Sequence, residues 1–151
     1  RLFEAATQLA AVIANSSKAI EEAMRLYGMH LGTAFQLIDD VMDYSSEAKD
    51  MGKNLGDDLA EGKPTLPLLY AMWHSEGDKM QEIRDAIEHS NGMEHLDSIL
   101  TSMKITGALE YTRQKAEEEA DKAIKCLTVL PDSRFKQALI GLAHASIKRT
   151  V

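Results

Sequence analysis

The chain has 151 residues, 44% of them hydrophobic and 27% charged, which is typical of a globular protein rather than a disordered segment. Its formal net charge of −7 at pH 7 argues against a nucleic-acid partner, because nucleic-acid-binding surfaces are basic. It has no run of roughly 18 apolar residues, so no transmembrane segment is predicted, and its single cysteine, Cys126, excludes an intrachain disulfide.

Hydrophobic residues recur at helical spacing from the start of the chain, and no segment shows the pattern of a strand. The first predicted helix covers residues 2–13. A second helix, capped by Ser17, is predicted over residues 18–45, roughly 40 Å long at 1.5 Å per residue. Because Arg1 already belongs to a helical pattern, we expect the chain to be a piece of a longer protein.

Gly28 and Gly32 lie inside this long predicted helix. A glycine in the middle of a helix destabilises it by about 1 kcal/mol relative to alanine. The two glycines therefore predict close packing of another segment, or access of a ligand, at this part of the helix.

A polar loop is predicted over residues 47–63, where glycines, lysines and acidic residues alternate. Pro64 and Pro67 are expected to open the next helix, because proline suits the first helical turn. Asp78 and Gln81 have the spacing of a capping box and predict the start of another helix.

The rest of the chain predicts three more helices. Two of them carry apolar residues at helical spacing over residues 96–103 and 109–127. The last helix is predicted to be capped by Asp132 or Ser133. Its apolar residues are expected to face the core: Phe135, Leu139, Leu142, Ala143 and Ile147.

The segment from Phe35 to Asp43 is the most informative one, because it places three carboxylates in an apolar helical run. Residues three or four apart on a helix are neighbours, so Asp39 and Asp43 lie one above the other. Gln36 lies one turn before them, and Asp40 lies beside that line.

These carboxylates need a positive partner from outside their own helix. Like charges at this spacing repel, and the end of a helix disfavours anions. The nearest basic residues in the sequence are Arg25 and Lys49. Mg²⁺, which prefers oxygen ligands, is the natural candidate. A solvated acidic face is the alternative for such a short pattern, but the apolar neighbours and the following loop favour a cation site.

The loop after the aspartates includes Gly52, Lys53, Gly56, Gly62 and Lys63. Glycine lets backbone approach a ligand closely, and lysine supplies a point charge for phosphate. The loop is not a Walker loop, since five residues separate Gly56 from Gly62 where that motif has four. A polar linker is the alternative for the loop alone. Beside three aspartates, it predicts a metal–diphosphate site.

The segments F-Q-L-I-D-D-V-M-D, G-K-N-L-G-D-D-L and E-G-K-P-T-L-P-L-L resemble the second aspartate-rich region of the trans-polyprenyl diphosphate synthases, in particular those of bacteria that make octaprenyl diphosphate. The resemblance implies an all-α isoprenoid-synthase helical bundle. Residues 1–151 would be the C-terminal portion of its single domain, without the first aspartate-rich motif.

The same resemblance implies a Mg²⁺-dependent trans-prenyltransferase. Its substrates would be isopentenyl diphosphate and an allylic diphosphate, and its product a long-chain all-trans polyprenyl diphosphate, octaprenyl in this case, for the side chains of ubiquinone or menaquinone. A cytoplasmic homodimer is expected. Because the first motif and the isopentenyl diphosphate site would lie earlier in the protein, residues 1–151 alone are expected not to catalyse the reaction.

The resemblance also implies roles for individual residues. Asp39 would bind Mg²⁺, and Asp40 and Asp43 would complete the acidic cluster. Lys53 would contact the allylic diphosphate, with Lys63 as a weaker candidate for the same role. A sixth residue, Gln36, would face the allylic carbon and help to stabilise its developing positive charge.

Two other functions compete with this interpretation. The first is a non-catalytic regulatory subunit of a heteromeric prenyl synthase, although such a subunit has no need for Gln36, Asp39 and Lys53. The second is a terpene cyclase. The G-K-N-L-G-D-D loop belongs to chain-elongating enzymes, and the second metal motif of the cyclases is absent from the sequence.

Overall fold

A computed structural model describes residues 1–45 and 55–148. These residues form helices and connecting turns, with no strand among them, so the predicted all-α class is confirmed. They group into two compact units, one of residues 1–38 and 115–148 and the other of residues 39–45 and 55–114. None of the helices in these ranges combines the length and the apolar character that crossing a bilayer requires.

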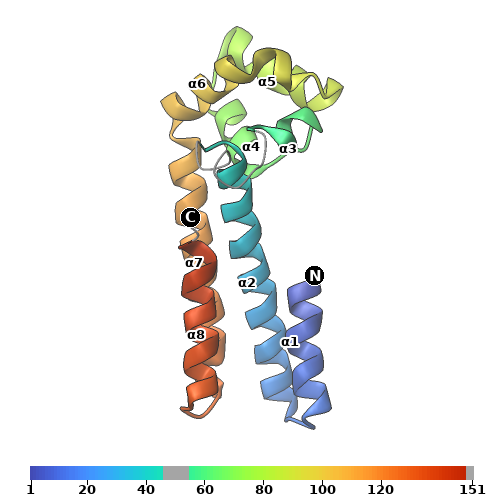
Figure 1. Cartoon of the computed structure of the whole chain (residues 1–151), viewed down its shortest axis with the longest axis vertical. Coiled ribbons are helices and arrows are strands. Elements are labelled where there is room, and N and C mark those ends of the chain that lie inside the picture. Colours follow the sequence, from blue (N-terminus) through green and yellow to red (C-terminus); the bar gives the residue numbers. More distant parts are fainter. Residues whose placement is uncertain (46–54, 149–151) are drawn as a thin grey trace. The chain divides into compact units, whose positions relative to one another are not determined.

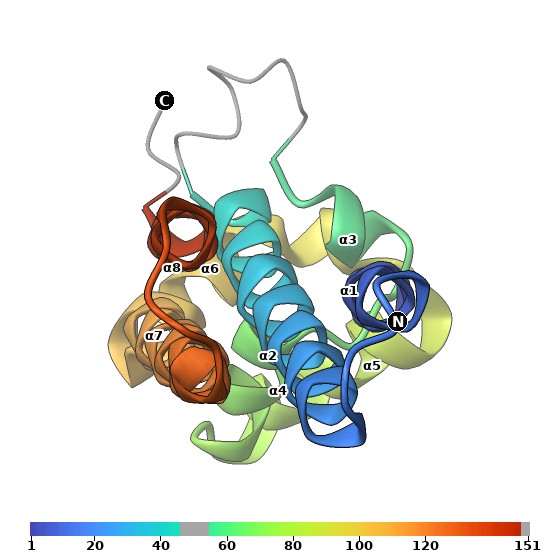
Figure 2. The same cartoon turned by 90° about the horizontal axis from the view of Figure 1, so that it is seen from below.

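The first unit consists of α1 (Leu2–Ile13), α2 (Lys18–Asp43) as far as Ile38, α7 (Ala108–Cys126) from Lys115, the 3-10 turn η3 (Leu127–Val129) and α8 (Arg134–Ile147). Helix α1 turns back into α2, and α7 turns back into α8, as Figures 1 and 2 show. The predicted Ser17 cap is confirmed, because its Oγ accepts the Ile20 N–H at 3.4 Å. Ser133 caps α8 by accepting the Lys136 N–H at 3.1 Å.

Close packing of α1 explains the two glycines of α2. Thr7 Oγ1 donates a hydrogen bond to the Met24 carbonyl oxygen at 2.6 Å, which ties the two helices together. A Cβ added at Gly28 would lie 2.5 Å from the Phe3 carbonyl oxygen. At Gly32 it would lie 3.2 Å from Phe3 Cβ. The helices therefore approach each other at a distance that only glycine allows at position 28.

The core of this unit lies between α2, α7 and α8. Its buried members are Tyr27, Leu31, Ala123, Leu127 and Ala143. The Tyr27 hydroxyl donates to the Leu139 carbonyl oxygen at 2.8 Å, and His30 Nδ1 lies 2.7 Å from Glu119 Oε2. Cys126 packs half-buried against the cluster, and burial raises the pKa of its thiol.

Tyr27 makes the stability of this unit depend on alkaline pH. Burial raises the pKa of Tyr27 from its ordinary value of 10.0 to about 12. The unfolded chain therefore loses this proton first, so the contribution of Tyr27 is complete below pH 10 and is lost as the pH rises through 12. We expect Tyr27→Phe to lower the free energy of unfolding at pH 7 by about 1 kcal/mol. In the same variant, the free energy of unfolding should decline less steeply between pH 10 and 11.5, as measured by urea unfolding. An unchanged decline would contradict the raised pKa of Tyr27.

Two of the residues predicted to face the core from α8 are exposed instead. Phe135 is 68% exposed and Leu142 is 52% exposed, whereas Ala143 is buried and Leu139 and Ile147 are half-buried. At about 100° per residue, Phe135 and Leu142 lie on one flank of the stripe formed by the other three. The prediction was wrong for these two because it drew the apolar stripe too wide.

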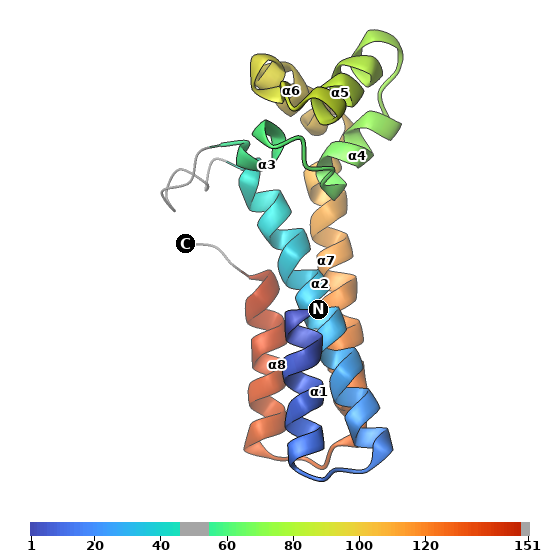
Figure 3. The ribbon, with the colours of Figure 1, turned by 90° about the vertical axis from the view of Figure 1, so that its right-hand side faces the viewer.

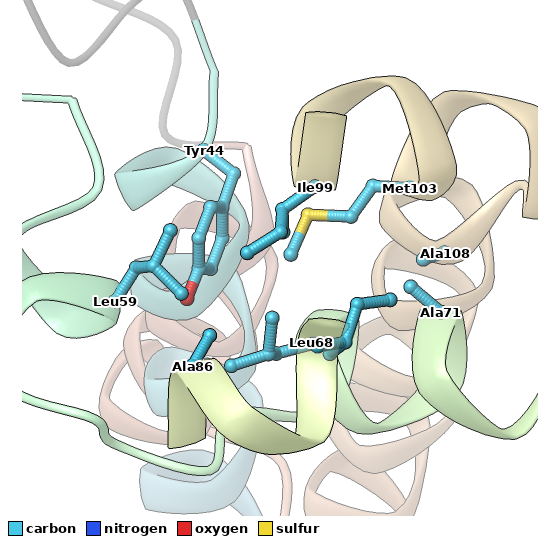
Figure 4. Packing of buried hydrophobic residues seen from close by; sticks show 9 residues of the cluster. Tyr44, Leu59, Leu68, Ala71, Ala86, Ile99, Met103 and Ala108 are labelled. Carbon is cyan, nitrogen blue, oxygen red and sulfur yellow. The ribbon is translucent and has the colours of Figure 1, made fainter. Parts of the chain in front are cut away.

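The second unit begins with the end of α2, from Asp39, and finishes with the start of α7, up to Gln114. Between them lie α3 (Asp57–Ala60), α4 (Leu66–Trp73), α5 (Gly77–His89), the 3-10 turn η2 (Gly92–His95) and α6 (Leu96–Thr106), as Figure 3 shows. Figure 4 shows its core, which is formed by apolar side chains of these helices together with Tyr44, which follows α2, and Ala108 of α7. The buried members are Tyr44, Leu59, Leu68, Ala71, Ile83, Ala86, Ile99, Met103 and Ala108.

Helices α4 and α5 both begin close to the positions that the sequence predicts. Pro67 lies in the first turn of α4, as predicted, while Pro64 precedes the helix. The predicted capping box of Asp78 is wrong. Helix α5 begins at Gly77, its N-cap residue is Glu76, and no side chain forms a hydrogen bond at this cap. Asp78 lies inside the first turn, where its charge still favours the positive end of the helix.

Candidate metal and diphosphate site

The aspartate cluster lies at the C-terminal end of α2, where the second unit begins. Asp40 and Asp43 are buried, with 6% and 5% of their surface exposed, and Asp39 is half-buried. A freely solvated acidic face would expose these side chains. The burial of two neighbouring carboxylates therefore favours the cation site over the solvated face.

The chain after the loop returns to the end of α2 and binds Asp43 through two backbone amides. The Gly56 N–H donates to the Asp43 carbonyl oxygen at 2.9 Å, and the Asp58 N–H donates to Asp43 Oδ2 at 3.1 Å. Gly56 has φ of +82°, in the left-handed region that favours glycine. This turn is what presents the Asp58 amide to the Asp43 carboxylate.

Lys63 brings a positive charge to the same place. Its Nζ donates to Asp58 Oδ1 at 2.9 Å and lies 3.9 Å from Asp40 Oδ1. The hydrogen bond to Asp58, together with the charges of Asp58, Asp40 and Asp39, raises the pKa of Lys63 against the opposing effect of desolvation. The Lys63 side chain is 43% exposed, so an anion from solvent can reach its ammonium group.

Tyr44 belongs to the core of the second unit and lies close enough to the polar cluster to feel the charges of its aspartates. Its hydroxyl forms a hydrogen bond with Thr65 Oγ1 at 3.2 Å, and its ring lies within the apolar cluster that Figure 4 shows. Burial raises the pKa of Tyr44, and the nearby charge of Asp43 acts in the same direction. The phenol thus stays neutral and adds no negative charge beside the carboxylates.

The structure brings together some of the predicted site residues. Asp40, Asp43 and Lys63 meet around Asp58, and the charge of Asp39 acts on Lys63. Lys53 lies outside the described residues. A further predicted residue, Gln36, belongs to the first unit.

Gln36 is exposed in that unit and lines a cavity of about 650 Å³. Phe3 and Leu2 of α1 and Gly32 and Phe35 of α2 lie on its wall. Gly32 and Gln36 therefore line the same cavity of the first unit.

Asp58 and Tyr44 are part of the cluster although no role was predicted for them. Asp58 contacts Asp43 through its backbone amide. Almost any residue can supply a backbone amide, so the residue type at position 58 does not predict this contact. The sequence predicts its side-chain contact with Lys63 only weakly, since the two residues are simply opposite charges five positions apart in the loop motif. Tyr44 directly follows Asp43, and its apolar ring gave no reason to place it beside carboxylates.

A second group of possible ligands lies on α5, away from the predicted residues. One ligand atom each from Asp85, Glu88 and His89 lies within 4.8 Å of the others. Glu88 and His89 are exposed, and His89 Nδ1 lies 3.1 Å from the Asp85 carbonyl oxygen. Exposed groups of this kind are common on helices, and we assign no role to it.

The donor set at the end of α2 suits a hard divalent cation. Asp39, Asp40 and Asp43 offer carboxylate oxygens, the ligand type that Mg²⁺ and Ca²⁺ prefer. Among the described residues the cluster contains carboxylates, a lysine and a phenol, without a thiol or an imidazole. Carboxylates for a metal and an accessible lysine beside them are the components of a site for a metal-bound diphosphate.

The helical fold and this aspartate-rich site are shared with a family of known proteins. Residues 1–103 match the family model of the polyprenyl synthetases, and the chain belongs to this family. It is 54% identical over 149 residues to the octaprenyl diphosphate synthase of Escherichia coli (strain K12), covering 99% of this chain and 46% of that protein. With the all-trans-nonaprenyl-diphosphate synthase (geranyl-diphosphate specific) of Rhodobacter capsulatus it shares 42% identity, over 99% of this chain and 45% of that protein.

A solved structure agrees with this assignment. The polyprenyl synthase from Caulobacter crescentus CB15, complexed with calcium and isoprenyl diphosphate, matches 99% of this chain with a TM-score of 0.88 and 38% sequence identity. The match covers 46% of that chain. The chain thus spans about half the length of the relatives it matches, and the resemblance to this family stated from its motifs is confirmed.

Proposed function

We propose that this chain is the C-terminal part of a polyprenyl diphosphate synthase that condenses isopentenyl diphosphate with an allylic diphosphate. The product would be a long-chain all-trans polyprenyl diphosphate, octaprenyl in this case, used for quinone side chains. The observation that carries the proposal is the meeting of buried Asp40 and Asp43 with the accessible Lys63 at one site. The identity with octaprenyl diphosphate synthases supports the product class.

The proposed reaction requires that the negative charge on the leaving diphosphate be stabilised. The allylic C–O bond breaks, and the diphosphate departs with the electron pair. The alkene of isopentenyl diphosphate then attacks the allylic cation, a C–C bond forms, and a proton passes to the released diphosphate. Mg²⁺ held by Asp39, Asp40 and Asp43 would neutralise the diphosphate oxygens.

The lysines and the glutamine of the motif complete this proposal. Lys63, and Lys53 from the loop, would donate hydrogen bonds to the diphosphate, which favours the charge that develops when the C–O bond breaks. The side-chain oxygen of Gln36 would face the allylic cation. We also propose a cytoplasmic homodimer as the working form of the full-length protein.

The test is an assay of the full-length protein that contains this chain. We expect it to convert isopentenyl diphosphate and farnesyl diphosphate in the presence of MgCl₂ into an all-trans octaprenyl diphosphate, identified by mass spectrometry after dephosphorylation. Removal of the metal with EDTA should abolish product formation, and added MgCl₂ should restore it. A folded protein that forms no product with any allylic diphosphate would contradict the proposal.

A further inference from the structure

Asp58 makes three hydrogen bonds in the proposed diphosphate site. Its backbone N–H donates to Asp43 Oδ2, and its side-chain Oδ1 accepts a hydrogen bond from Lys63 Nζ at 2.9 Å. A third contact closes the turn, because the Lys63 N–H donates to the Asp58 carbonyl oxygen at 2.9 Å. Asp58 thus connects Asp43, at the C-terminal end of α2, to Lys63.

The side-chain contact is the one that places Lys63. A lysine side chain has four rotatable bonds, and the Lys63 side chain is 43% exposed. Its distance to Asp58 Oδ1 is 2.9 Å, whereas its distance to Asp40 Oδ1 is 3.9 Å, too long for a hydrogen bond. Asp58 is therefore its hydrogen-bond partner and Asp40 its more distant electrostatic neighbour.

We propose that Asp58 is a positioning residue of this site, which holds the Lys63 ammonium group in the place where a metal-bound diphosphate is to be contacted. The inference rests on the proposed function and deepens it. Asp58 itself need not touch the substrate. It orders Lys63 before binding, so that less side-chain entropy is lost when the diphosphate arrives.

Two effects of Asp58 on an anion oppose each other. Its negative charge repels a diphosphate, while its hydrogen bond orders the lysine that attracts one. Asparagine separates these effects, because Asp58→Asn keeps an acceptor oxygen for Lys63 and removes the charge. Asp57, exposed on the same turn of α3, provides the matched control, since Asp57→Ala removes the same charge and leaves the Lys63 contact in place.

The experiment measures binding of inorganic diphosphate with MgCl₂ to the full-length protein by isothermal titration calorimetry. We expect Asp58→Ala to weaken binding roughly three- to tenfold, the range set by ordering one long side chain. Asp58→Asn and Asp57→Ala should bind as tightly as the parent protein or slightly more tightly. Asp58→Ser, whose hydroxyl is too short to reach Lys63, should behave like Asp58→Ala and serves if the alanine variant unfolds.

A double-mutant cycle shows whether Asp58 acts through Lys63. In the Lys63→Ala background, Asp58→Ala should cause no further loss, because the lysine that it positions is gone. Undiminished binding by Asp58→Ala, or the same loss with and without Lys63, would overturn the inference while the proposed function still stands. If the folded parent protein binds no diphosphate at all, the proposed function fails, and this inference fails with it.

Discussion

Replacing Asp39 by alanine in the full-length protein is expected to lower kcat by at least about a thousandfold, or ~4 kcal/mol of transition-state stabilisation. Asp39 is the carboxylate that the motif assigns to the metal. It is half-buried beside the buried Asp40 and Asp43, and its charge acts on Lys63. Loss of this proposed metal ligand would remove charge stabilisation from the departing diphosphate when the C–O bond breaks. The measurement is steady-state turnover of farnesyl diphosphate and isopentenyl diphosphate at saturating MgCl₂.

Asp57→Ala is the matched control for this experiment. It removes one carboxylate from an exposed position in the same unit, so kcat should stay within about twofold of the parent value. The melting temperature of each variant shows whether it is folded. Unchanged turnover of a folded Asp39→Ala variant would favour the competing interpretation, in which the chain belongs to a non-catalytic subunit and another protein supplies the metal site.

The sequence predicted the helices of this protein better than the contacts between them. The long α2 was expected from residue 18 to 45 and covers Lys18–Asp43, because its apolar residues follow one face for many turns. Cap residues with a hydroxyl, Ser17 and Ser133, were also found. The start of α5 was missed by one residue: the helix begins at Gly77, whose φ of +57° is a conformation that glycine favours.

The sequence predicted the carboxylates and Lys63 of the candidate site, but it did not predict the hydrogen bonds that join them. The carboxylates and Lys63 could be recognised from their spacing and from the family motif. The contacts that join them run through the backbone amides of Gly56 and Asp58 to Asp43, 13 and 15 positions earlier in the chain. Spacing along a helix does not report on a turn that brings a distant amide back, so Asp58 could only be identified from the structure.

Gly28→Ala should be among the most destabilising small substitutions in the first unit, lowering its free energy of unfolding by about 3 kcal/mol. The new Cβ would clash with Thr7 Oγ1 and lie 2.5 Å from the Phe3 carbonyl oxygen, and backbone cannot move aside as a flexible side chain can. To fit the methyl group, α1 must shift away from α2. That shift would break the hydrogen bond from Thr7 Oγ1 to the Met24 carbonyl oxygen.

The measurement is urea unfolding of the variant, together with amide hydrogen exchange in α1. Gly141 provides the control, because it lies inside α8 and a Cβ there would meet nothing within 4 Å. Gly141→Ala should therefore stabilise the protein by about 0.5–1 kcal/mol, the usual gain of alanine over glycine in a helix. Gly32→Ala should lie between the two, since its nearest neighbour is the Phe3 side chain at 3.2 Å. If all three substitutions stabilised the protein alike, α1 would not pack on α2 as described, because intrinsic helix propensity alone would then decide the outcome.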